Sequence, residues 1–269
     1  MYDVATPRPA SVGTLLREWR ARRRLSQLDL ASGAGVSPRH LSFVETGRSR
    51  PSREMVLHLA EHLDVPLRER NALLMAAGYA PTYHATDYGA PEMRAVSDAL
   101  EGVLRGHEPY PAILVDRRWQ LVSANRAAVL LVEGIAPELL EPPANVLRAS
   151  LHPEGLAPRI ANLSQWADHI IGNLERQVAV TGDEGLRALA DELTGYARAQ
   201  GAEPAAPGEG PVPIALPLRL RVDGGELRFV TTIATFGTAL DITLAELALE
   251  AFLPADAATA AALHERFPA

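Results

Sequence analysis

Residues 26–46 read SQLDLASGAGVSPRHLSFVET, and this stretch decides the fold of the N-terminal part of the chain. Ser26 is a good N-cap for a short helix. The inner face of that helix would carry Leu28, Leu30 and Ala31. Ala34-Gly35-Val36 then predicts a tight turn, because Gly35 can adopt positive φ without strain. The stretch therefore begins with a short helix and a sharp change of direction.

A second helix is predicted directly after the turn. Ser37 caps it, and Pro38 occupies its first position, where a missing N–H costs nothing. Leu41 and Val44 would point inward. The outer and flanking faces would carry Arg39, His40, Ser42 and Phe43. A short helix with exposed side chains near its N-terminus fits the major groove of DNA, so the stretch predicts a helix-turn-helix DNA reader.

Further helices are predicted on both sides, which makes residues 11–80 a five-helix domain. The first runs from Ser11 to about Arg23, with Leu15, Leu16 and Trp19 inward. Pro51-Ser52 opens the fourth, whose inward residues would be Met55, Val56, Leu59, Ala60 and Leu63. The fifth runs from about Leu67 to Ala77, and Gly78 ends it.

Composition allows two domains and points away from membranes. The chain has 269 residues, of which 47% are hydrophobic, and no cysteine. It has no run of eighteen apolar residues, and its first ten residues lack the apolar core of a secretory signal. We therefore expect a cytoplasmic protein without disulfides and without a membrane partner.

Charge is divided unevenly along the chain. Residues 1–80 carry 12 Arg and 8 acidic residues, a net charge of +4, whereas residues 81–269 carry 14 Arg and 25 acidic residues, a net charge of −11. A basic N-terminal part followed by an acidic remainder suits a DNA-binding domain attached to a second domain that DNA phosphates repel.

Residues 81–91 read as a linker and residues 92–269 as a second domain. A helix over residues 91–106 follows the linker and would either join the domains or pack against a partner copy. It would carry Met93, Val96, Leu100, Val103 and Leu104 on one side. Residues 112–116 and 119–124 predict a hairpin, and Asn125 caps a helix.

Two amphipathic helices and three strands complete the second domain. The helices are predicted from Ile160 to Val178 and from Asp183 to Tyr196. Residues 201–213 predict a mobile loop. Strands follow at 214–222, 226–236 and 245–253, with a hairpin turn at Asp223-Gly224-Gly225. A helix over 256–266 closes the chain. This order predicts a PAS-like α+β domain, a five-stranded antiparallel sheet with helices on one face.

The segment Gly13–Tyr79 resembles the lambda-repressor-like (XRE-type) DNA-binding domain. The resemblance is carried by LLREWRARRRLSQLDLASGAGVSPRHLSFVETGRSRPSREMVLHLAEHLDVP. It implies that Gln27 binds backbone phosphate and braces the recognition helix, and that Glu45 pairs with Arg20. Residues implied to face bases or flanking phosphates are Ser37, Pro38, Arg39, His40, Ser42 and Phe43. Arg48 and Arg50 are implied to touch the DNA backbone. For Phe43 a place in the core is an open alternative.

The second domain resembles the MmyB-like ligand-binding domain of actinobacterial regulators. The segments that carry the resemblance are PAILVDRRWQLVSANRAA, LHPEGLAPRIANLSQW, LPLRLRV and LRFVTTIATFG. The resemblance implies a sensor of a small molecule, of an apolar or fatty-acid-like kind. It establishes no particular ligand.

A PAS-type pocket would lie between the sheet and the helices, with apolar walls and a few polar groups. The candidate ligand-binding residues are Trp119, Asn125, Arg159, Asn162, Trp166, His169, Arg228 and Thr232, with His152 also considered. Asn162, Trp166 and His169 would share one helix side. Trp166 is equally a core residue and His169 a hydrogen-bonded one. Arg159 and Arg228 would pair a ligand carboxylate or lie on the surface.

Enzyme motifs are lacking. The sequence contains no G-x-S-x-G, H-E-x-x-H, Walker or G-x-G-x-x-G motif. His58 and His62 are four residues apart on a helix, as metal ligands can be, but no further ligand clusters with them. We expect no catalytic residues, no metal and no cofactor.

Two functions fit the sequence. The first is a transcription factor that binds a roughly palindromic DNA operator as a homodimer and responds to a small-molecule effector. The second is a DNA-binding regulator whose second domain is a protein-interaction module without a metabolite ligand. A pocket between sheet and helices would favour the first, and a filled core beneath a large exposed apolar patch would favour the second.

Overall fold

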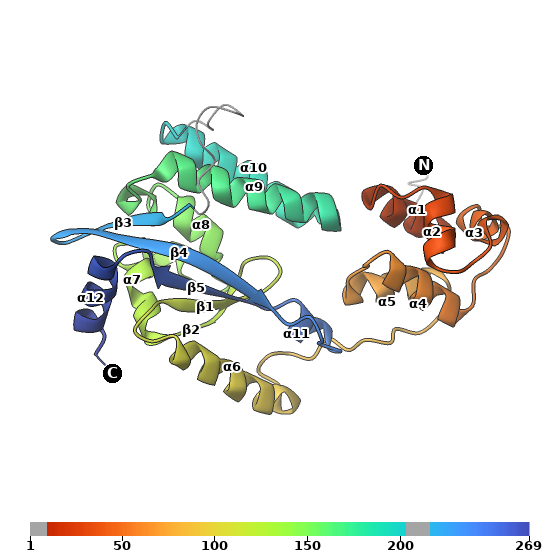
Figure 1. Cartoon of the computed structure of the whole chain (residues 1–269), viewed down its shortest axis with the longest axis horizontal. Coiled ribbons are helices and arrows are strands. Elements are labelled where there is room, and N and C mark those ends of the chain that lie inside the picture. The colour runs from red at the N-terminus through yellow and green to blue at the C-terminus, as the bar shows by residue number, and fades with distance from the viewer. Residues whose placement is uncertain (1–9, 203–215, 269) are drawn as a thin grey trace, which may run out of the picture. The chain divides into compact units, whose positions relative to one another are not determined.

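The computed structural model describes residues 10–202 and 216–268 (Figure 1). The chain divides into two compact units, residues 1–85 with 240–242, and residues 86–239 with 243–269. The predicted mobile loop over residues 201–213 lies almost wholly outside the described residues.

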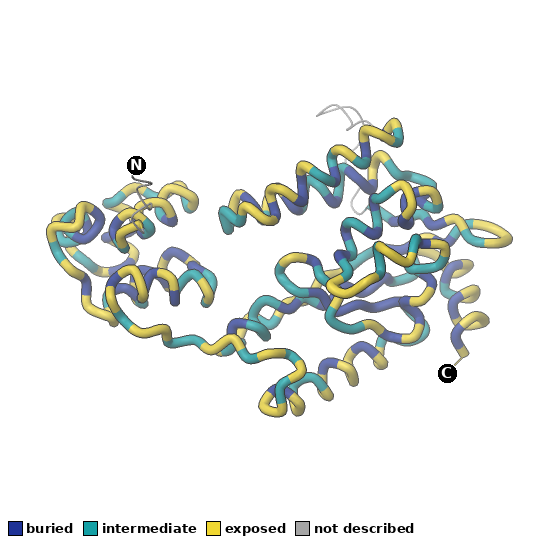
Figure 2. The backbone as a smooth tube through the Cα atoms, turned by 180° about the vertical axis from the view of Figure 1, so that it is seen from behind, coloured by how far each residue is buried: buried dark blue, intermediate teal, exposed yellow. Residues whose placement is uncertain are grey.

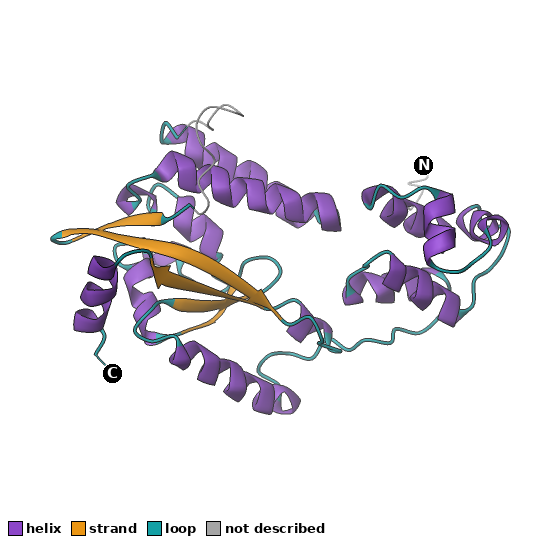
Figure 3. Ribbon diagram, viewed as in Figure 1, coloured by secondary structure: helices purple, strands orange, loops and turns teal. Residues whose placement is uncertain are grey.

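The N-terminal unit is a bundle of five helices, as predicted (Figure 3). Four of them begin at a serine N-cap whose hydroxyl accepts a backbone N–H: Ser11, Ser26, Ser37 and Ser52. Such caps satisfy backbone donors that a helix leaves open at its start. The bounds are α1 Val12–Arg22, α2 Gln27–Gly33, α3 Pro38–Glu45, α4 Arg53–His62 and α5 Leu67–Ala76.

The bundle core is built from the predicted inner faces with one exception. Leu16, Leu30, Leu41, Leu59 and Leu74 are all fully buried or nearly so. Leu28, expected beside Leu30, is 64% exposed. Residues that are two positions apart in a helix are separated by about 200° of rotation. Leu28 therefore lies nearly opposite Leu30 and cannot share its face.

The C-terminal unit is built on one five-stranded antiparallel sheet, which confirms the predicted class. The strand order is β2-β1-β5-β4-β3, so the last strand of the chain lies at the centre. β5 pairs with β1 on one side and with β4 on the other. The bounds are β1 Ala112–Val115, β2 Leu121–Ala124, β3 Leu218–Val222, β4 Gly225–Thr235 and β5 Ala248–Pro254.

Helices surround this sheet, and α9 and α10 run side by side (Figure 1). The α-helices are α6 Arg94–Gly106, α7 Val129–Val132, α8 Val146–Leu151, α9 Leu163–Thr181, α10 Glu184–Ala199, α11 Ile242–Ala245 and α12 Ala257–Arg266. Short 3₁₀ turns occur at Pro91–Met93 (η1), Arg126–Ala128 (η2), Pro137–Leu139 (η3) and Ala157–Arg159 (η4).

Both faces of the sheet are covered, which corrects the expectation of helices on one face. Leu100 and Leu104 of α6 pack in one cluster with Leu114 of β1 and Ala251 of β5. The alternate residues of the same strands pack into the large cluster on the other face, where α8, α9 and α10 lie. Buried residues therefore follow one another along β1 and β5, as Figure 2 shows. α6 is thus a cover for the sheet, and Val103, expected on its buried side, is 49% exposed.

Several element boundaries also differ from the prediction, two of them for a clear reason. The helix expected from Ile160 begins at Leu163, because Ile160 is extended and forms a bridge with Leu220 of β3. The strand expected from residue 245 begins at Ala248, since the short helix α11 comes first. Among the described residues no helix is long and apolar enough to cross a bilayer.

Candidate functional site

The turn between α2 and α3 has the predicted geometry. Gly35 has φ +63°, which glycine adopts without penalty. The Ser37 hydroxyl accepts the N–H of His40, and Pro38 is the first residue of α3. Ser37, Pro38 and Arg39 are exposed, whereas His40 and Ser42 are half-buried. The N-terminal turn of α3 therefore presents Arg39 outward, next to Ser37 and Pro38.

Phe43 lies beside the bundle core and not within it. Its ring is half-buried and belongs to no core cluster of the bundle. The guanidinium groups of Arg39 and Arg48 lie over the ring, at 5.4 and 6.0 Å from its centroid. These cation–π contacts place two arginines on one aromatic surface.

A buried carboxylate holds the recognition helix α3 against α1 and α2. Glu45 accepts hydrogen bonds from Arg20 Nε at 2.7 Å and Arg20 Nη2 at 2.9 Å, which confirms the expected pair. Gln27 Nε2 donates to the same carboxylate at 2.7 Å, so Gln27 braces the helix as expected. Burial opposes ionisation of Glu45, but the hydrogen bonds from Arg20 and Gln27 outweigh it and hold its pKa below the usual value. Contact of Gln27 with phosphate stays a prediction.

Arg50 has partners inside the bundle. Its Nε and Nη2 donate to the carbonyl of Ala77 at 3.2 and 3.0 Å, and its guanidinium lies 5.4 Å from the ring centroid of Tyr79. These contacts fasten the loop after α3 to the end of α5. A phosphate contact by Arg50, expected from the sequence, would have to use its remaining N–H groups.

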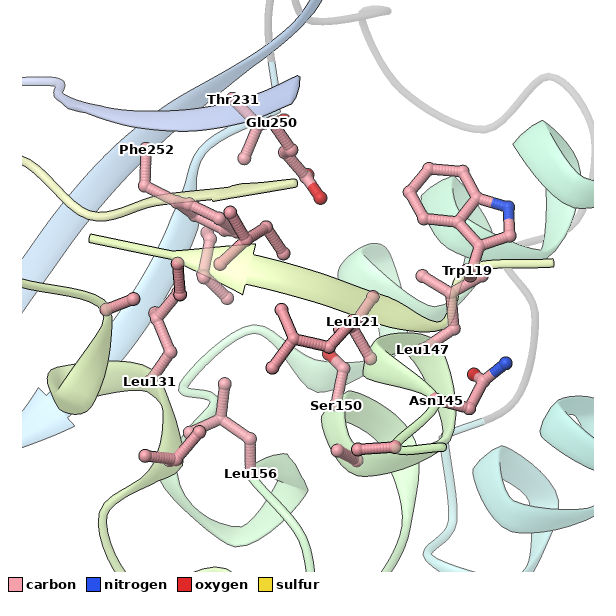
Figure 4. Close-up of a pocket in the computed structure, with 18 of the residues that line it drawn as sticks. Trp119, Leu121, Leu131, Asn145, Leu147, Ser150, Leu156, Thr231, Glu250 and Phe252 are labelled. Atoms are coloured by element: carbon pink, nitrogen blue, oxygen red, sulfur yellow. The ribbon is translucent and has the colours of Figure 1, made fainter. Parts of the chain in front are cut away.

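The C-terminal unit contains a pocket of about 350 Å³ between the sheet and α7, α8 and α9 (Figure 4). Its walls are mostly aliphatic and aromatic, and they include Leu131, Leu147, Leu156, Ile170 and Phe252. This volume lies in the range of small-molecule sites, which are typically apolar with a few polar groups.

Four of the eight predicted ligand-site residues line this pocket: Trp119, Asn125, Trp166 and His169. Arg159 lines a separate depression near α12, and Asn162, Arg228 and Thr232 line neither. For the two residues on β4 the reason is strand parity. Thr231 and Ile233 face the pocket, so Arg228 and Thr232 point to the opposite face of the sheet.

In the four predicted residues that line the pocket, most polar groups already form hydrogen bonds within the protein. Asn125 Oδ1 accepts the N–H groups of Ala112 and Ala128, and its Nδ2 donates to the carbonyls of Leu104 and Tyr110. These four hydrogen bonds use both N–H donors and both acceptor positions of the side-chain amide. Asn125 therefore joins α6, β1 and η2.

The two indole N–H groups and His169 also have internal partners. Trp119 Nε1 donates to Gln177 at 3.1 Å and Trp166 Nε1 donates to Ser150 at 3.2 Å. His169 stacks on Trp166 and lies 3.0 Å from Asn173 Nδ2. Burial, and secondarily Arg176, lowers the pKa of His169 below its usual value, so the imidazole is neutral at pH 7.

The predicted residues outside the pocket have structural partners. Asn162 binds the backbone of β3 through Pro217 O and Arg219 N, and Arg159 donates to the carbonyls of Leu130 and Glu133. Arg228 pairs with Glu226 at 2.9 Å. His152 packs edge-on against Tyr196. The two arginines expected to pair a ligand carboxylate therefore lie elsewhere.

Glu250, which was not predicted as a site residue, lies in the centre of β5 and lines the pocket. Only 8% of its surface is exposed, and burial raises the pKa of its carboxyl group to about 7. The available signal was a single acidic residue within the apolar run ALEAFL. No group of three or more potential metal ligands occurs among the described residues.

The fold and these sites define a class: a helix-turn-helix DNA-binding transcription regulator with a second, pocket-bearing domain. Residues 96–265 match the MmyB-like transcription regulator ligand binding domain, and residues 11–73 match a helix-turn-helix domain. The first match covers more than half of the chain, so the chain belongs to the MmyB-like transcription regulators.

Among solved structures, the chain is similar to the clp gene regulator ClgR from Corynebacterium glutamicum. The two are 26% identical over 36% of this chain and 90% of that chain, with a TM-score of 0.22. No curated protein matches the chain significantly.

Proposed function

We propose that this regulator binds a roughly palindromic operator as a homodimer and is controlled by a small, predominantly apolar ligand. The observation that carries the proposal is the combination, in one chain, of an outward-facing arginine on a braced recognition helix and a mostly apolar pocket of about 350 Å³. We infer that the protein acts by binding, without catalytic chemistry of its own. A regulator of chromosomal genes would work in the cytoplasm.

Direct base contact is assigned to Arg39. Its side chain is exposed at the N-terminal turn of α3 and is supported by the Phe43 ring. A guanidinium can donate two hydrogen bonds to guanine O6 and N7. The other proposed DNA contacts are Gln27, Ser37, Pro38, His40, Ser42, Phe43, Arg48 and Arg50.

Replacing Arg39 by Ala is expected to weaken binding to the preferred site by about 1–3 kcal/mol, the usual value of one bidentate base contact. The site is first selected from random DNA with the unaltered protein, and affinities are then measured by fluorescence anisotropy at fixed salt. Affinity for scrambled DNA should fall much less. Arg198→Ala removes the same charge from an exposed position on α10 and should change neither affinity. Equal losses on both DNAs for Arg39→Ala would reduce Arg39 to a phosphate contact.

The pocket supports a metabolite-sensing domain over a protein-interaction module. A module of the second kind would have a filled core between sheet and helices, whereas this core contains a cavity whose lining is mostly apolar. Native mass spectrometry of the purified full chain tests both parts of the proposal. We expect twice the mass of one chain, with a retained small molecule or an added one bound per chain. A monomer with no uptake of apolar probes would contradict the proposal.

A further inference from the structure

The pocket contains one buried carboxyl group that has no partner among the residues that the structure describes. Glu250 lies in the middle of β5, and its carboxyl group points into the pocket next to Thr231 (Figure 4). Among the described residues, this carboxyl group forms no hydrogen bond or ion pair. Burying such a group without a partner is unfavourable. The pocket therefore offers a strong, unused hydrogen-bond acceptor.

The other charged or titratable residues of the pocket do not balance Glu250. Arg126 on η2 donates to the carbonyl of Pro268 at 2.7 Å and pairs with Glu108 at 3.2 Å. His169 on α9 is neutral at pH 7 for the reasons given above. The strands on either side of β5 contribute to the pocket only uncharged residues, namely Ile113 of β1 and Thr231 and Ile233 of β4.

We propose that the pocket binds a lipophilic amine, whose ammonium group donates to Glu250 while its hydrocarbon part fills the apolar walls. This rests on the proposed sensing function and names the chemical class of its ligand. A cationic donor forms a charge-assisted hydrogen bond with a carboxylate and compensates its buried charge. A ligand carboxylate at the same place would meet a like charge whenever Glu250 is ionised.

Two hydroxyl groups also line the pocket, those of Thr231 and Ser150. Thr231 lies on the same face of β4 as Ile233, and Ile233 is directly opposite Glu250 in the sheet register. Ser150 of α8 accepts the Trp166 N–H and keeps a second lone pair. An ammonium group has only donors, so a pocket that offers a carboxylate and hydroxyl oxygens as acceptors suits it better than it suits a ligand carboxylate.

The test compares three probes with the same chain: decylamine, 1-decanol and decanoate, titrated calorimetrically into the full-length protein at pH 8. Decylamine should bind about 10- to 100-fold more tightly than decanol, the usual value of a charge-assisted hydrogen bond. Decanoate should bind most weakly. Glu250→Gln should lower the decylamine affinity to that of decanol and leave decanol binding nearly unchanged. Asp191→Asn, which removes an exposed acid from α10 outside the pocket, should change nothing.

A pH series gives an independent readout. Because burial raises the pKa of Glu250 to about 7, its carboxyl group is mostly protonated at pH 6 and mostly ionised at pH 8. Decylamine stays cationic over this range, so its affinity should rise about tenfold between the two values. With Glu250→Gln the affinity should not change with pH.

The outcomes separate this inference from the proposed function. Equal binding of all three probes, tightest binding of decanoate, or an unchanged decylamine affinity in Glu250→Gln would overturn the amine proposal and leave an apolar sensor standing. Failure of every probe to bind would overturn both.

Discussion

Replacing Arg20 by Met is expected to destabilise the N-terminal bundle by about 3–5 kcal/mol, the usual loss when one partner of a buried ion pair is removed. The Glu45 side chain is fully buried and takes two hydrogen bonds from Arg20. Without Arg20 the carboxylate keeps the neutral Gln27 as its side-chain hydrogen-bond donor, and its remaining cationic neighbour is the more exposed Arg17, 3.9 Å away. Since α3 is held through Glu45, specific DNA binding should be lost together with stability.

Hydrogen exchange of the full chain measures this loss, because it reports α1–α3 separately from the second domain. Arg24→Met, at an exposed position just after α1, should leave exchange unchanged. The double variant Arg20→Met, Glu45→Met should regain much of the loss, since no buried charge is left unpaired. A double variant less stable than Arg20→Met would show that the pair stabilises the bundle for another reason.

The same pair makes the bundle sensitive to acid. The pKa of Glu45 is lower in the folded chain than in the unfolded chain, so the ionised carboxylate makes its full contribution to the stability of the bundle above the unfolded-state pKa. It is lost as the pH falls through the folded-state pKa.

Glu250→Gln is expected to raise the free energy of unfolding of the C-terminal unit by about 3 kcal/mol at pH 8. Burial raises the folded-state pKa of Glu250 from 4.5 to about 7. The unfolded chain therefore loses this proton at a lower pH than the folded chain. The free energy of unfolding is highest below pH 4.5 and falls between pH 4.5 and pH 7. Above pH 7 it stays at the lower value. A neutral glutamine avoids the deficit.

Denaturant unfolding of both proteins at pH 5 and pH 8 tests this expectation. The gain should be small at pH 5, where the carboxyl group is mostly protonated in the folded chain. Asp191→Asn on exposed α10 should give the same stability as the unaltered protein at both pH values. A gain of equal size at pH 5 would mean that the substitution acts through packing and not through ionisation.

Much of the N-terminal unit was predictable because its signals are local. A serine N-cap sits next to the helix that it caps, and apolar spacing identifies most of the inner face. The pairing of Arg20 with Glu45 came from the resemblance to a known domain, and the structure confirms it. Leu28 was misplaced because two apolar residues two positions apart cannot share a helix face.

The second domain was predictable as a set of strands and helices, but the faces of its strands were not. β4 contains two adjacent threonines, and either could face the pocket by pattern alone. The register with β5 decides that Thr231 does so and that Thr232 does not. Arg228 lies four positions before Thr232, so its side chain is on the same face of the strand as Thr232 and also points away from the pocket.

By itself, the sequence determined the class of each domain and the recognition helix, because these follow from short-range spacing. The expectation of an apolar pocket came from the resemblance to a known domain. Only the tertiary structure decided what lies inside the pocket. The last strand, β5, inserts between β1 and β4, which are over a hundred residues apart in the chain. That insertion buries Glu250 among side chains distant in sequence, and burial gives its carboxyl group a pKa and a position that no local pattern encodes.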